Sequence, residues 1–173
     1  MADNESFEKK ERRMLIMRNF VFGVEDSLVS TVGLLSGIAA VGTPRETIIL
    51  TGVVLVFVEA FSMAVGTFLA EHSAEEAVLH MHSGVSDRDS RLAGAIMFVS
   101  YFISGFVPLV PYLVFEGIAG LIVSVGATLV ALFVLGMISA RVSRVPIFLE
   151  ALRMFLIGGA AVGVGVLVGV LVG

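Results

Sequence analysis

The stretch that decides the fold is residues 19–42, NFVFGVEDSLVSTVGLLSGIAAVG, a mostly apolar run that contains two adjacent acids, Glu25 and Asp26. At about 1.5 Å per helical residue, this run is long enough to cross the roughly 30 Å hydrocarbon core of a bilayer. An ionised carboxylate inside a spanning helix costs at least about 2.5 kcal/mol on insertion scales, so it indicates a functional site with a partner nearby. The stretch therefore predicts a membrane helix that carries part of such a site.

The composition of the whole chain is that of an integral membrane protein. Of its 173 residues, 57% are apolar and 15% are charged, and the mean hydropathy is +1.02. Soluble domains are nearer about 45–50% apolar and about 25% charged. The chain has no cysteine, which excludes disulfides and thiolate metal sites, and its net charge of -4 gives no argument for binding nucleic acid. We therefore expect one membrane domain, residues 1–173, with no large soluble module.

Five runs of the chain are long and apolar enough to form membrane-spanning helices. They cover residues 19–42, 47–70, 92–115, 117–140 and 147–173. Residues 1–18 precede them as a basic segment, which is typical either of an amphipathic helix on a membrane surface or of a solvated tail. Residues 71–91 form a polar link that contains all three histidines. The expected fold class is an all-α integral membrane protein with five transmembrane helices.

The basic residues predict how these helices are oriented. Ten of the eleven Lys and Arg residues lie in residues 1–18, in the 71–91 link, or in and just after the link between the fourth and fifth spans, and Arg45 alone lies on the other side. The N-terminus is therefore expected in the cytoplasm and the C-terminus on the opposite side. Small residues at helical spacing predict close helix packing or, in the first span, dimerisation. They are Gly33, Gly37, Gly165, Gly169 and Gly173.

Counting residues from the charged boundary gives the depth of the intramembrane acid. Asp26 lies eight residues after Arg18, and Met63 lies eight residues before Glu71, so each is about 12 Å inside the cytoplasmic boundary. Glu59 is one helical turn from Met63 on the same face, about 6 Å deeper. The first two spans are joined by a short link and are expected to be antiparallel neighbours. Asp26, Glu59 and Met63 are therefore predicted to converge.

These three side chains form a ligand set with a chemical preference. Carboxylate oxygens bind divalent cations in general, whereas a thioether favours softer transition metals such as Fe²⁺ over magnesium or calcium. A methionine in a helix is most often core packing, but beside two intramembrane acids we interpret Met63 as a ligand. Hydroxyls at Ser30, Thr31 and Ser62 would either add oxygen ligands or bond back to helix carbonyls, which is the commoner arrangement.

The polar link, residues 71–91, contains further potential metal ligands outside the membrane. If the second span continues as a helix, His72, Glu76 and His80 fall on one face and Glu71, Glu75 and His82 form a neighbouring stripe. Imidazole and carboxylate together suit Fe, Mn, Zn or Co, although a solvated helical extension explains the same residues equally well. Near the start of the last span, Glu150 is three residues from Arg153 and is expected to pair with it, with a role in metal relay as the alternative.

Short motifs in four of the spans match the pattern of one known family. Residues 22–29, FGVEDSLV, are similar to its F-G-x-x-D-G-L-V pattern, with Asp26 on the transport aspartate. Ser62, Met63 and Gly66 resemble its S-M-x-x-G, with Met63 on the transport methionine. Residues 105–112, GFVPLVPY, match its G-F-x-P-L-x-P-Y, and Glu150 begins a stretch that looks like its E-x-x-x-x-G-x-x-A region. The chain therefore resembles the vacuolar iron transporter family.

The resemblance implies a dimer of five-span subunits that moves Fe²⁺, and often Mn²⁺, out of the cytoplasm in exchange for protons. This chain departs from the family pattern at Ser27, where the family usually has glycine. It also has Leu55 where some members carry a transport glutamate, so either Glu59 substitutes from one turn away or the site differs. The glutamate-rich metal-binding domain of plant and parasite members is reduced here to residues 71–91.

The resulting hypothesis is a homodimeric Fe²⁺ and Mn²⁺ transporter that exchanges metal for protons across a lipid bilayer. It is expected to have no catalytic site and no cofactor other than the ion it moves, because no catalytic triad or phosphate-binding loop is present. The alternatives are a membrane-embedded binding or scaffold subunit, and a transporter of Co²⁺ or Zn²⁺. A prokaryotic cell membrane is the first choice of location because the loops are minimal, and a vacuolar membrane is the second.

Overall fold

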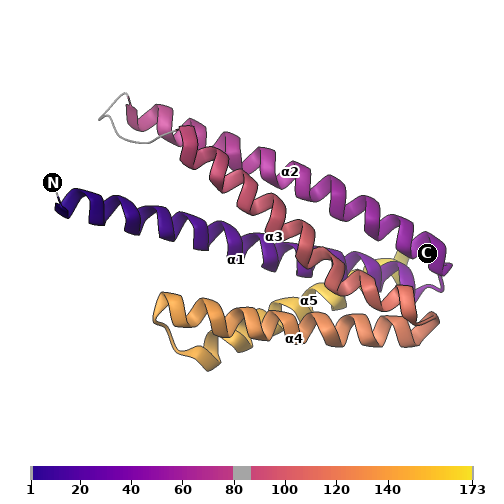
Figure 1. Ribbon diagram of the computed structural model, residues 1–173. Coiled ribbons are helices and arrows are strands. Elements are labelled where there is room, and N and C mark those ends of the chain that lie inside the picture. Colours follow the sequence, from indigo (N-terminus) through magenta and orange to yellow (C-terminus); the bar gives the residue numbers. More distant parts are fainter. Residues whose placement is uncertain (1, 80–86, 173) are drawn as a thin grey trace.

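The computed structural model describes the backbone of residues 2–79 and 87–172, and side chains within 10–74 and 89–172 except residue 11 (Figure 1). This part of the chain forms five α-helices. They are α1 Ala2–Ala40, α2 Arg45–Leu79, α3 Asp87–Val114, α4 Gly117–Ser143 and α5 Ile147–Val172. Each helix is long and apolar enough to cross a membrane. The predicted all-α fold is therefore confirmed, with five helices that could each cross a membrane, and the protein is a multi-pass membrane protein.

Two of the helices extend well beyond the hydrocarbon core of a bilayer. α1 begins at Ala2 and runs without a break through the basic segment into the apolar one. α2 continues to Leu79 through the first residues of the polar link. Neither extension contains proline or glycine, the two residues that most strongly oppose helix formation.

α1 is the central helix of the bundle. α3 packs on one side of it and also on α2, whereas α4 and α5 pack on its other side (Figure 1). α1 and α2 touch each other less extensively than either touches α3. The expectation that the first two spans pair directly therefore holds only in part, because α3 packs against both.

Buried apolar side chains join α1 to each group of neighbours. On one side, Leu28 packs with Leu132, Leu135 and Met154 of α4 and α5. On the other side, Leu35 packs with residues of α2 and α3, namely Ile48, Leu109 and Tyr112. The core thus consists of two clusters that hold α1 from opposite directions.

α1 and α5 cross with their backbones in contact. A Cβ atom placed on Gly165 would lie 1.9 Å from the carbonyl oxygen of Gly33, and one on Gly37 would lie 2.5 Å from the carbonyl oxygen of Gly165. On Gly169 it would lie 2.3 Å from the carbonyl oxygen of Gly37. These glycines therefore serve helix packing within one chain, the first of the two interpretations above.

Charged side chains gather at the two ends of the bundle. At the N-terminal end, where α1 begins, Arg18 pairs with Glu71 and Arg12 pairs with Asp89 at 3.3 Å. At the opposite end, Arg45 forms an ion pair with Glu116 at 3.2 Å, and its Nε donates to the carbonyl oxygen of Tyr112 at 2.7 Å. It also donates to the carbonyl oxygen of Leu113. Arg45 thereby satisfies carbonyl groups that the end of α3 leaves without helical partners.

Candidate metal site

The ion pair between Arg18 and Glu71 sets the register of α1 against α2. Asp26 follows Arg18 by eight residues and Met63 precedes Glu71 by eight, so both lie about 12 Å from this pair along their helices. Glu59 lies one turn beyond Met63. The residue count that related Asp26 to Met63 therefore starts from two side chains that are in contact.

The carboxylates of Asp26 and Glu59 are close enough to interact electrostatically. Both side chains are half-buried, within the parts of α1 and α2 that are suited to span the membrane. Two like charges within electrostatic reach repel each other, and the repulsion grows where less water screens them. A proton or a divalent cation between them would relieve that repulsion, so the pair is chemically suited to hold either one.

Tyr101 of α3 is the residue that connects this pair to the rest of the bundle. It is fully buried, and its hydroxyl is hydrogen-bonded to the Ser30 hydroxyl at 2.8 Å. Its carbonyl oxygen accepts a hydrogen bond from Ser27 Oγ at 2.7 Å. The tyrosine hydroxyl is also within electrostatic reach of both Asp26 and Glu59. Tyr101 therefore contacts α1 at two positions just after Asp26, one and four residues beyond it.

Tyr101 was missed by the sequence interpretation, although a signal for it was present. It is one of only two tyrosines in the chain, and its hydroxyl needs a partner inside an apolar span. Ser30 was identified as a hydroxyl that would either reach the site or bond back to its own helix. In the structure its Oγ binds Tyr101 and also approaches the carbonyl oxygen of Ser27 at 3.5 Å.

Replacing Tyr101 with Phe is expected to lower the free energy of unfolding by about 1 kcal/mol, because the Ser30 hydroxyl loses its partner. The measurement is a double-mutant cycle of Tyr101→Phe and Ser30→Ala, read from thermal or denaturant unfolding of the purified protein. The two effects should not add, since both substitutions remove the same hydrogen bond. Strictly additive effects would show that the two hydroxyls do not interact.

The described residues offer two carboxylates here rather than a complete metal cage. No group of three or more His, Asp or Glu side chains comes together within the part of the chain whose side chains are described. Met63, half-buried on the same face of α2 as Glu59, supplies the nearest thioether along that helix. A metal ion bound by Asp26 and Glu59 would therefore take further ligands from Met63, hydroxyls, water or a second copy of the chain.

The candidates outside the membrane are dispersed. Glu71 pairs with Arg18, and the His72 ring stacks on Phe68 with centroids 5.7 Å apart. Glu150 lies on α5 and pairs with Arg153 at 3.9 Å, as expected, away from Glu71. Glu75 and Glu76 belong to α2, but their side chains lie outside the described residues, as do His80 and His82 altogether.

Glu25 has surroundings different from those of its neighbour Asp26. Its carboxylate interacts most strongly with Arg153 of α5, and also with Glu150. It lines a cavity of about 420 Å³ between α1 and α4, together with Met14, Met17 and other residues. The two adjacent acids thus face different parts of the bundle: Asp26 faces Glu59, and Glu25 faces the start of α5.

Comparison with known proteins gives one family and several relatives. The model of the VIT family matches residues 17–83 and 71–170, which together cover most of the chain. Vacuolar iron transporter homolog 4 of Arabidopsis thaliana is 30% identical over 166 residues, covering 91% of this chain and 83% of the relative. Vacuolar iron transporter homolog 3 from the same plant is 30% identical, with 91% and 82% covered. Homolog 1 is 29% identical over 168 residues.

Proposed function

Because this chain belongs to the VIT family, we propose that it transports Fe²⁺, and also Mn²⁺, out of the cytoplasm. The observation that carries the proposal is that Asp26 of α1 and Glu59 of α2 are both half-buried in the parts of their helices suited to span a membrane, within electrostatic reach of each other. The family consists of transporters and not enzymes, which agrees with the expectation that the chain has no catalytic site. The names of the plant relatives support iron as the transported metal.

The ligand chemistry supports a soft divalent ion. Asp26 and Glu59 supply hard oxygen donors that bind any divalent cation, so they do not select among metals. Met63 adds a thioether, which favours Fe²⁺ over Mg²⁺ and Ca²⁺. Met63 is thus the residue through which this site would discriminate against the abundant hard cations of the cytoplasm.

Proton exchange follows from the same carboxylates. They bind metal only when deprotonated, so protons arriving from the far side of the membrane would release the ion. In this proposal the basic N-terminal end of the bundle faces the cytoplasm, as its Lys and Arg residues favour. Asp26 and Glu59 alternate between holding a metal ion and holding protons.

We propose a homodimer as the working form. Among the described residues of one copy, no group of three or more His, Asp or Glu side chains could hold a metal ion, and Asp26 with Glu59 alone gives fewer ligands than a divalent cation prefers. A second copy packed against the first would provide a second pair. The location follows the earlier order of preference: a prokaryotic cell membrane first, and a vacuolar membrane second, which the names of the relatives favour.

The experiment is metal uptake into proteoliposomes that contain the purified protein, with internal Fe²⁺ and internal pH followed together. We expect Fe²⁺ entry accompanied by proton movement in the opposite direction. A binding or scaffold subunit would give neither, so their joint absence would refute the proposal. Competition by Mn²⁺, Co²⁺ and Zn²⁺ in the same assay ranks the transported metals.

Met63→Leu tests the thioether in this assay. The substitution conserves volume and apolar character, so the fold should be retained. We expect Fe²⁺ uptake at limiting concentration to fall about tenfold, with a smaller effect on Mn²⁺, because Mn²⁺ depends less on soft ligands. Equal losses for both metals would remove Met63 from the selectivity of the site.

A further inference from the structure

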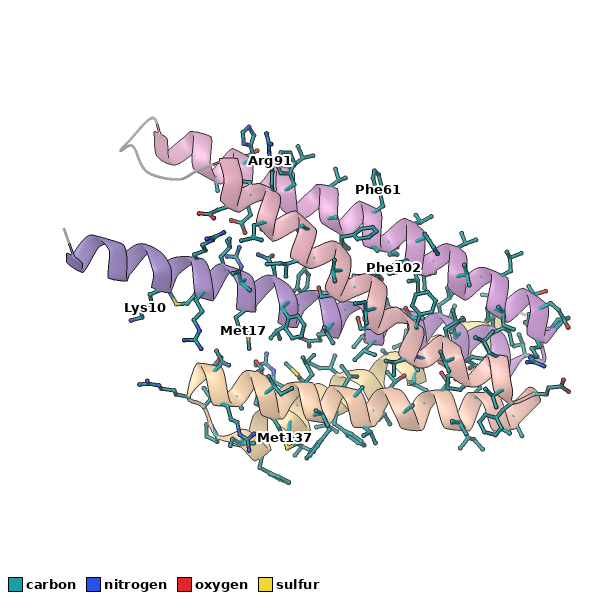
Figure 2. The ribbon with its side chains drawn as sticks, in the orientation of Figure 1. Lys10, Met17, Phe61, Arg91, Phe102 and Met137 are labelled. Carbon is teal, nitrogen blue, oxygen red and sulfur yellow. The ribbon has the colours of Figure 1, made fainter. Side chains whose placement is uncertain are left out.

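A cavity of about 670 Å³ opens at the N-terminal end of the bundle, between α1 and the end of α4. Four basic side chains line it: Lys10, Arg13, Arg141 and Arg144. The other described lining residues are Met14, Met17 and Val142, so the described part of its walls combines positive charge with apolar surface. Figure 2 shows Lys10 and Met17 on the side of α1 that faces α4.

The described basic residues of α1 differ in what they contact. Arg12 and Arg18 are paired with Asp89 and Glu71 on the side of α2 and α3. Lys10 and Arg13 instead line the cavity on the side of α4. The first set therefore joins helices, whereas the second set meets two further cations from α4.

Convergence of these four cations requires the fold, because they come from segments more than about 120 residues apart in a chain of 173. A preference for basic residues on one side of a membrane accounts for their presence there but not for their gathering around one cavity. The four cations repel one another, and an anion between them would relieve that repulsion. The cavity is thus suited to an anionic ligand.

The turn after α4 places two of the arginines on this cavity. Arg141 lies in the last turn of α4, and Arg144 ends the helix in the left-handed conformation, with φ 57° and ψ 37°. Glycine or asparagine usually occupies such a position, because a Cβ atom is disfavoured there. Arg144 is the only described residue other than glycine with a positive φ. Arg144 therefore supplies a positive charge at a position where glycine would fit the backbone more easily.

The position of the cavity in the bundle indicates which anion fits. Met14, Met17 and Val142 also line the adjoining 420 Å³ cavity, which continues along α1 past Val21 and Phe22 and ends at Glu25. Its lining is mainly apolar and also includes Arg18, Ser139 and Ser143. A ligand with a charged head and an apolar tail would occupy both. We propose that this cavity binds an anionic phospholipid, with its phosphate among the four basic side chains and an acyl chain along α1 and α4.

The experiment measures lipid binding to the purified full-length protein in detergent by native mass spectrometry. Phosphatidylglycerol and phosphatidylcholine are titrated separately, and thermal unfolding is followed at each concentration. We expect phosphatidylglycerol to bind more tightly and to raise the unfolding temperature. Since each basic residue contributes about fivefold to affinity for anionic lipid, the double variant Arg141→Gln, Arg144→Gln should bind it about 25-fold more weakly.

Matched variants distinguish lipid binding in this cavity from a general attraction of anionic lipid to positive charge. Arg12→Gln combined with Arg91→Gln removes the same charge at the same end of the bundle, but from α1 and α3, and should leave lipid affinity within about twofold. Arg141→Lys with Arg144→Lys should retain most of the binding. Lys10→Gln with Arg13→Gln tests the cavity from its other wall if the α4 variant does not fold. Equal losses in the α4 and control variants would overturn the proposal.

A soluble phosphate is the remaining rival ligand. Glycerol 3-phosphate carries the same anion without acyl chains, and we expect it neither to stabilise the protein nor to displace phosphatidylglycerol at equal concentration. If it did both, and did so only while Arg141 and Arg144 were present, the lipid assignment would be wrong. The proposal does not depend on iron transport, because every readout is binding or unfolding.

Discussion

Asp26→Asn should reduce Fe²⁺ uptake into proteoliposomes at least about 100-fold. Loss of a residue that only orients a metal ligand costs about 10- to 100-fold in affinity or activity, and loss of the ligand itself should cost more. The amide keeps the size of the side chain, but it removes both the negative charge and the ability to exchange a proton. Both halves of the proposed cycle, metal binding and proton release, therefore fail together.

Glu25→Gln is the matched control for this substitution. It removes one negative charge from the adjacent position of the same helix, but Glu25 faces Arg153 and Glu150 rather than Glu59. We expect uptake within about threefold of the unsubstituted protein, because only the general attraction for cations is weakened. If the two variants lost uptake equally, net charge would matter rather than the pairing of Asp26 with Glu59.

Gly165→Ala should lower the free energy of unfolding by about 3 kcal/mol or more. The added Cβ atom would lie 1.9 Å from the carbonyl oxygen of Gly33, so α1 and α5 must separate to admit it. Overpacking of a tight contact usually costs about 1–3 kcal/mol, and here the obstacle is backbone rather than a side chain that can turn away. Thermal unfolding of the purified protein in detergent measures the effect.

Gly163→Ala provides the control on the same helix. A Cβ atom at Gly163 would have no other atom within 4 Å, so the substitution only changes helix propensity. Stability should stay the same or rise slightly, because alanine is the better helix former. Equal destabilisation by both substitutions would mean that α5 does not pack on α1 through Gly165.

Much of this fold was predictable because membrane helices follow simple rules of length and polarity. Runs of about 20 apolar residues gave the number and order of the helices. Arg18 and Glu71, from which the positions of Asp26 and Met63 were counted, form an ion pair in the structure. The convergence of Asp26, Glu59 and Met63 on a metal ion stays a prediction. Motifs in the spans were sufficient to indicate the family, which the comparisons confirm.

What could not be predicted was the position of α3. The short link between the first two spans suggested that they are direct neighbours. In the structure, small residues at the contacts allow α3 to approach both α1 and α2. A Cβ atom on Gly105 would lie 2.6 Å from Val56 of α2, and one on Gly23 of α1 would lie 2.2 Å from Ser100 Oγ. Because nothing in the order of the helices encodes this packing, Tyr101 could not be connected to the site in advance.

The ion pairs at the two ends of α2, Arg45 with Glu116 and Glu71 with Arg18, indicate the thickness of the bilayer that fits this protein. From Arg45 to Glu71 the helix rises through 26 residues, or about 39 Å, close to the roughly 40–45 Å of a bilayer with its headgroups. The charged side chains at the two ends of the bundle can therefore lie among the lipid headgroups on both surfaces, with little mismatch between the helices and the hydrocarbon core. Along α2, Glu59 lies about 21 Å from Arg45 and about 18 Å from Glu71, near the midplane of the membrane. An ion held there is almost equally far from both aqueous compartments.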